Sequence, residues 1–160
     1  MTHEDEGHYS AKHPAGTAPD PAVAAAVKEK AEAGTAGAAQ GGAAGAAAEG
    51  RITCTAAHEI AAELGVPPAK VGKTIDLLEY RLIECELGLF GSTVALEVPR
   101  SADDLHQELR DRLVGAASKG RVSCLTCWEF ADELGLPRRA ASGACEVLGL
   151  KIKPCQLGAF

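Results

Sequence analysis

The chain has 160 residues, a formal net charge of −6, and 46% hydrophobic against 24% charged residues. This length predicts one or two small domains. The composition of neither half of the chain is typical of a polyanion-binding protein. No apolar run is long enough to span a membrane, and the acidic start at Met1 to Glu6 is not followed by the apolar stretch of a secretory signal. We therefore expect a cytoplasmic protein without a membrane partner, in which the six cysteines stay reduced.

The first fifty residues differ from the remainder of the chain. They contain 17 Ala and 8 Gly and no Leu, Ile, Phe or Trp. Such a segment buries too little apolar surface to offset the entropy lost on ordering. Residues 21–33 favour transient helix because they are rich in alanine, but they lack a hydrophobic stripe that would dock them. The sequence predicts a disordered Ala/Gly-rich arm over residues 1–45.

An internal repeat dominates the rest of the chain. Residues 50–90 align without a gap on residues 120–160, and 14 of these 41 positions are identical. A repeat of this kind indicates two copies of one small module. We predict module 1 over residues 46–99 and module 2 over residues 100–160.

Module 1 shows a sequence of short elements. A strand at residues 50–54 precedes a helix whose apolar positions recur at helical spacing, namely Ala57, Ile60, Ala61 and Leu64. Gly65 ends this helix, and Pro67 and Pro68 form a corner before a second helix. That helix buries Val71, Ile75 and Leu78. The alternating residues 81–87 predict a strand that forms a hairpin with a returning strand at Val94, Leu96 and Val98.

Module 2 repeats this order, and the helix that precedes it is clearer. Ser101 is suited to cap a helix with Leu105, Leu109 and Leu113 in one row. Module 2 shows no counterpart of the returning strand, because its copy of the repeat reaches Phe160, the last residue of the sequence.

The stretch Glu59-Ile60-Ala61-Ala62-Glu63-Leu64-Gly65-Val66, followed by Val71 and Leu78-Glu79, resembles the helix-turn-helix core of winged helix proteins. The second copy has the same frame in Phe130-Ala131-Asp132-Glu133-Leu134-Gly135-Leu136-Pro137. The resemblance covers about 100 residues. It implies a mainly α fold with small β-hairpins (α+β), built from two tandem winged helix-turn-helix-like modules.

In most winged helix proteins the second helix enters the DNA major groove and the wing touches the backbone. The resemblance therefore implies a DNA-binding protein of the transcriptional regulator type. The positions that match the DNA-facing residues of that superfamily are Lys70, Lys73, Thr74 and Arg81 in copy one, and Arg138, Arg139, Ser142, Lys151 and Lys153 in copy two. Lysine and arginine are the residues that phosphate contacts need.

Two alternatives stay open. Glu84 and Glu86 on the first wing strand would repel phosphate, and winged helices also serve as non-catalytic protein-docking modules, so a protein partner is the competing interpretation. The charges on the second helices are equally compatible with simple solvation of an exposed face. No Ser–His–Asp arrangement or complete phosphate-binding loop is present, so we expect no enzymatic activity.

The cysteines follow the repeat. Cys54 and Cys85 match Cys124 and Cys155, and each pair is predicted to be neighbours across a small sheet. Four cysteines of copy two resemble a metal or iron–sulfur ligand set: Cys124, Cys127, Cys145 and Cys155. Cys127 and Cys145, however, stand where copy one has the core residues Ala57 and Ile75. We therefore favour buried structural thiols and no cofactor, with metal binding or a redox disulfide as alternatives.

Overall fold

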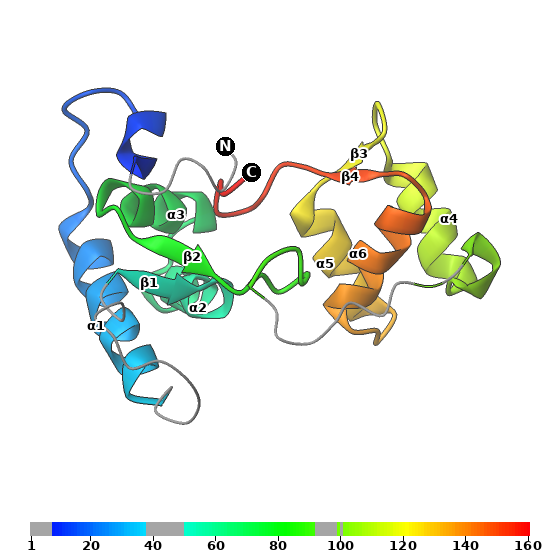
Figure 1. Ribbon diagram of the computed structural model, residues 1–160, viewed down its shortest axis with the longest axis horizontal. Coiled ribbons are helices and arrows are strands. Elements are labelled where there is room, and N and C mark those ends of the chain that lie inside the picture. The colour runs from blue at the N-terminus through cyan, green and yellow to red at the C-terminus, as the bar shows by residue number, and fades with distance from the viewer. Residues whose placement is uncertain (1–7, 38–49, 92–98, 100) are drawn as a thin grey trace. The chain divides into compact units, whose positions relative to one another are not determined.

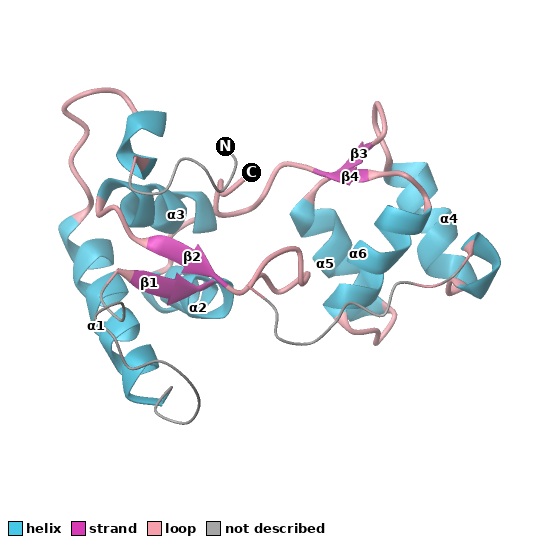
Figure 2. Cartoon of the chain, viewed as in Figure 1, coloured by secondary structure: helices cyan, strands magenta, loops and turns pink. Residues whose placement is uncertain are grey.

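The computed structural model describes residues 8–37, 50–91, 99 and 101–160. It is mainly helical with a few short strands (Figures 1 and 2). In chain order the described elements are η2 (Tyr9–Lys12), α1 (Pro21–Gly37), β1 (Arg51–Thr53), α2 (Cys54–Leu64), α3 (Pro68–Leu77), β2 (Arg81–Ile83), η3 (Ala102–Asp104), α4 (Gln107–Ala116), β3 (Arg121–Val122), α5 (Cys124–Glu133), α6 (Arg138–Val147) and β4 (Lys151–Ile152). They form two compact units, residues 1–83 with 157–159, and residues 84–156 with 160.

In both copies of the repeat a strand, two helices and a second strand follow one another. Thr53 caps α2 by accepting a hydrogen bond from the backbone N–H of Ala56, and Ser123 caps α5 in the same way from Thr126. Gly65 ends α2 in the left-handed conformation at φ 62°, where glycine carries no steric cost. The local signals of the sequence therefore place these helices correctly.

The strands pair differently from the predicted hairpins. β1 pairs in parallel with β2, with Arg51 opposite Arg81, and β3 pairs in parallel with β4, with Arg121 opposite Lys151. The expectation that residues 81–87 form one strand is wrong beyond Ile83, since β2 ends there. The returning strand predicted at 94–98 lies outside the described residues. In each copy, two helices cross over between two parallel strands.

The N-terminal segment corrects the prediction of a disordered arm for residues 8–37. Helix α1 packs against α2, α3 and β1, and it buries Val23 and Val27 in the core of its unit (Figure 1). Lys30 adds ion pairs to Glu59 (2.8 Å) and Glu63 (2.9 Å). The prediction failed because two valines one turn apart, flanked by alanines, suffice as a docking stripe.

Each copy of the repeat contributes the segment with its Leu-Gly pair to the unit that holds the helices of the other copy. Residues 84–91 of copy one belong to the second unit, where the Leu87 carbonyl accepts a hydrogen bond from Ser142 Oγ at 2.5 Å. Leu157 of copy two belongs to the first unit, where its carbonyl lies against Gly72. Leu87 and Leu157 are both buried. Gly72 and Ser142 are equivalent positions of the repeat, so the exchange is reciprocal.

Helix α4 completes the second unit. It packs against α5 and α6 and buries Leu109 and Leu113, as the row of leucines predicts. Its cap differs from the expectation, because His106 rather than Ser101 accepts the hydrogen bond of the first turn, from the Leu109 N–H. Ser101 instead directly precedes the short η3. The core of this unit therefore lies between α4, α5 and α6.

Candidate nucleic-acid interface

The predicted DNA-contacting residues of α3 do not form an open face. Thr74 is buried, and its hydroxyl donates to the Lys70 carbonyl at 3.0 Å. The Lys70 ammonium forms an ion pair with Asp20 at 2.7 Å, and the Asp20 pKa is lowered chiefly by that contact. Lys70 and Lys73 are both exposed on α3, Lys70 within its ion pair, and Arg81 is half-buried on β2. The assignment of Thr74 to a DNA-facing surface is wrong.

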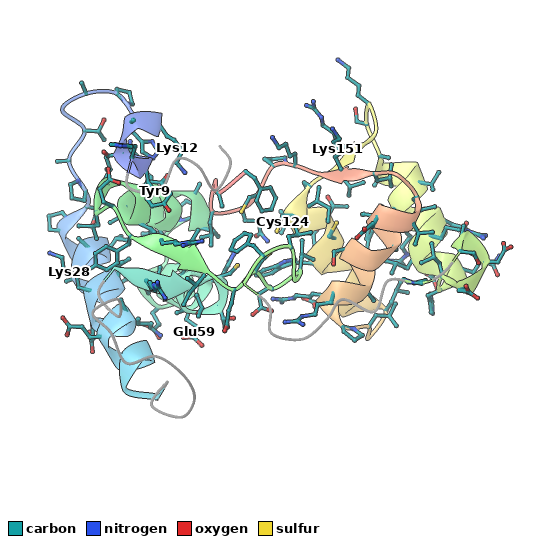
Figure 3. The ribbon with its side chains drawn as sticks, in the orientation of Figure 1. Tyr9, Lys12, Lys28, Glu59, Cys124 and Lys151 are labelled. Carbon is teal, nitrogen blue, oxygen red and sulfur yellow. The ribbon has the colours of Figure 1, made fainter. Side chains whose placement is uncertain are left out.

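The N-terminal segment covers part of α3. η2 packs against this helix, and Lys12 Nζ and His13 Nε2 lie 2.8 and 2.9 Å from Asp76 Oδ2. Figure 3 shows Tyr9 and Lys12 on this segment. Glu79 accepts hydrogen bonds from the Tyr9 and Ser10 backbone N–H groups. DNA bound at this part of α3 would have to displace these contacts.

The equivalent face of α6 is also covered. Ser142 is buried, so its assignment to the DNA interface is wrong as well, and Arg138 is engaged on several sides. The Arg138 guanidinium lies 3.7 Å from the Trp128 ring centroid and 2.8 Å from Asp132 Oδ2, which lowers the Asp132 pKa. Glu86 lies 3.5 Å from it. Arg139 is half-buried. Helix α6 therefore presents a neutralised rather than a positive face.

Exposed cations gather instead on the two short strands of the second unit. We call this set the basic ribbon: Lys119, Arg121, Lys151 and Lys153, all exposed. Lys119 lies in the turn that leads into β3, Arg121 is opposite Lys151 in the parallel pair, and Lys153 directly follows β4 (Lys151 is labelled in Figure 3). Within the described part of the chain no carboxylate lies within ion-pair distance of any of them.

The geometry of a β-ribbon explains why these charges lie together. Neighbouring strands are about 4.8 Å apart, and residues i and i+2 project to the same face about 6.6 Å apart. Lys151, Lys153 and Arg121 are therefore held well within the Debye length of about 8–10 Å. The sequence predicts Lys151 and Lys153 as site residues, whereas Lys119 and Arg121 were missed. The recurrence of Arg51 as Arg121 in the repeat was a sequence signal for this residue. The nearness of Arg121 to Lys151, however, depends on strand pairing.

The cysteines of the predicted metal set do not form one site. Cys127 and Cys145 are buried with their sulfurs 4.0 Å apart. Their shared hydrogen bond raises the pKa of Cys127 and lowers that of Cys145, while burial raises the pKa of Cys124. The Cys124 sulfur accepts from Gln156 Nε2 at 3.7 Å. Among the described residues no three His, Cys, Asp or Glu side chains are grouped to hold a metal ion.

The prediction that Cys127 and Cys145 are core residues is confirmed by their burial. Copy one has Ala57 and Ile75 at these positions, both buried. One position is larger in copy two and the other smaller, so the two substitutions change the size of the helix contact in opposite directions. Packing alone accounts for this pair.

Comparisons with known proteins give no matching family model, no matching curated protein and no matching solved structure. None of the described helices combines the length and the apolar character needed to cross a membrane.

Proposed function

We propose that this protein is a non-catalytic DNA-binding protein that contacts the phosphate backbone through the basic ribbon. The observation that carries the proposal is the set of four exposed cations on β3 and β4 and in the residues next to these strands, without carboxylate partners among the described residues. Like charges held this close repel one another, and a polyanion relieves that repulsion while releasing its own counterions.

The resemblance to winged helix proteins supports DNA as the polyanion. β4 follows the second helix of its copy, where a member of that superfamily has the first strand of its wing. The wing contacts the backbone in those proteins, and backbone contacts position a protein without reading the base sequence. We therefore propose that the ribbon, rather than α3 or α6, makes the primary contact. A regulatory role in transcription follows as the class of function that such binding serves.

Fluorescence anisotropy of the full chain with random duplex DNA over a salt series tests the proposal. Engagement of all four cations predicts a slope of log affinity against log salt of roughly −3.6, because each phosphate contributes about 0.9. The double variant Lys151→Ala/Lys153→Ala should reduce the magnitude of that slope by roughly 1.8.

A charge-matched control separates the ribbon from the helices. The variant Lys28→Ala/Lys73→Ala also removes two exposed cations, one on α1 and one on the predicted DNA-facing side of α3. We expect its affinity to stay within about twofold of the wild type, apart from the general effect of net charge. An equal loss in both variants would remove the special role of the ribbon. Absence of binding at low salt would reject DNA and leave protein docking as the interpretation to pursue.

A further inference from the structure

Three thiols of the second unit have no part in the proposed DNA contact. Cys85 and Cys155 are equivalent positions of the repeat, and each begins a turn that its own backbone N–H closes. Cys85 N–H donates to the Phe90 carbonyl at 3.0 Å, and Cys155 N–H donates to the Phe160 carbonyl at 3.1 Å. The Phe90 and Phe160 rings meet edge to face with their centroids 6.4 Å apart. The two turns, and the cysteines that open them, therefore adjoin.

Cys124 lies beside the second of these turns. Its backbone N–H donates to the Pro154 carbonyl at 3.1 Å, and its sulfur accepts from Gln156 Nε2 at 3.7 Å. The residues on both sides of Cys155 therefore hold Cys124 close to it, beyond the ends of β3 and β4 rather than across the strand pair. Burial raises the pKa of the Cys124 thiol and of the Cys85 thiol, and the neighbouring Cys155 thiol raises both further.

Exposure distinguishes the members of this group. All six cysteines are described, five of them are buried, and Cys155 alone is half-buried. Small oxidants attack accessible thiols first, and a second thiol close by converts the oxidised product to a disulfide. Cys155 has the access that the first step needs. Cys124, at the start of α5, has the backbone contacts that keep it beside Cys155 for the second step.

We propose that Cys155 is a peroxide-oxidised modification site and that Cys124 is its resolving partner. The Cys155 sulfur attacks one oxygen of hydrogen peroxide, the O–O bond breaks, and Cys155 sulfenic acid and one water form. The Cys124 sulfur then attacks the Cys155 sulfur, an S–S bond forms, and the S–O bond breaks. The hydroxide that leaves takes up the Cys124 proton as a second water. Both thiols are oxidised by two electrons in total, and the peroxide is reduced. The resulting disulfide joins the segment after β4 to the start of α5, next to Lys153 of the basic ribbon.

Thiol titration of the denatured chain after brief peroxide treatment, with peptide mass spectrometry, tests this assignment. The wild type has six thiols and should lose two, and a peptide pair linked through Cys124 and Cys155 should appear. The Cys155→Ser variant should lose no thiols to peroxide through this disulfide. Cys124→Ser should stop at a Cys155 sulfenic acid that a dimedone probe captures. The second variant keeps the test valid if the first one is poorly folded.

The control variant Cys127→Ala/Cys145→Ile removes the other close pair of sulfurs and rebuilds the copy-one residues at that contact. It should lose the same two thiols as the wild type. A linkage between Cys127 and Cys145, or between Cys85 and Cys155, would overturn the assignment of the partner. Resistance of all six thiols to peroxide would overturn the modification site itself.

Discussion

The carbonyl of Leu157 lies directly against Gly72, so that a β-carbon on Gly72 would be only 1.8 Å from the carbonyl oxygen. Contacts below about 3 Å are not found between real β-carbons and backbone atoms, so either the helix or the Leu157 segment would have to move. Gly72 sits within α3, where glycine is otherwise a poor choice for helix stability. The close approach of Leu157 is the physical reason for glycine at this position.

Gly72→Ala is therefore expected to destabilise the protein. On an unobstructed helix the same change stabilises by up to about 1 kcal/mol, whereas overpacking against backbone costs about 1–3 kcal/mol. Urea unfolding followed by circular dichroism measures the net effect. Gly115→Ala is the matched control, because Gly115 also lies in a helix and a β-carbon added there would meet nothing within 4 Å. The prediction fails if both alanines stabilise the protein to the same extent.

The sequence predicts what is local in this fold and misses what is not. The caps Thr53 and Ser123 and the terminator Gly65 act within a few residues, so the pattern alone places α2 and α5. The exchange of Leu87 and Leu157 could not be read from the repeat, because identical motifs give no indication of which copy each one packs against. Pairing of strands separated by two helices is equally invisible to local periodicity.

The candidate site follows the same division. Lys151 and Lys153 are predictable from their place in the repeat, but Arg121 joins them only through the parallel pairing with β4. The burial of Thr74 and Ser142 depends on how their helices pack, which positions carried over from a resemblance cannot decide. The choice of the ribbon over the helices as the proposed contact therefore depends on strand pairing and helix packing.

Cys127 and Cys145 should behave as a compensating pair, because Cys127 is larger than its counterpart Ala57 and Cys145 is smaller than its counterpart Ile75. Cys127→Ala alone leaves a small void and should cost about 1 kcal/mol, and Cys145→Ile alone overpacks the α5–α6 contact and should cost about 1–3 kcal/mol. The double variant should cost less than the sum of the two, since it restores the copy-one combination. A double-mutant cycle measured by urea unfolding gives the coupling energy. Strict additivity would show that the two side chains do not compensate for each other.

Docking of the N-terminal segment should depend on the ionisation of Glu79. The Ser10 hydroxyl, and then the Ser10 and Tyr9 backbone N–H groups, hold the pKa of Glu79 below its ordinary value of 4.5. Because the folded pKa is depressed, this contribution is present above 4.5 and is lost as the pH falls through the folded pKa.

Amide exchange of Tyr9 and Ser10 measures this docking. Protection in the wild type should fall as the pH is lowered from about 6 to about 3, after correction for intrinsic exchange. Glu79→Gln should have low protection at both ends of that range. Glu59→Gln serves as a control, because Glu59 binds Lys30 of α1 rather than η2. If the wild type and Glu79→Gln show the same pH profile, the carboxylate does not hold the segment.

Arg138 provides the sharpest distinction between the helix and the ribbon as the DNA contact. Its guanidinium stacks on Trp128 and pairs with Asp132, so Arg138→Ala should destabilise the second unit by about 1–2 kcal/mol. Trp128 is the one tryptophan of the chain, so its fluorescence during urea unfolding reports the loss directly. DNA affinity under native conditions should stay within about twofold, apart from the effect of one lost charge. Arg138→Lys keeps that charge but loses the planar fork, and it should show most of the destabilisation with unchanged DNA binding. A large loss of affinity in both variants, with wild-type stability, would return α6 to the interface.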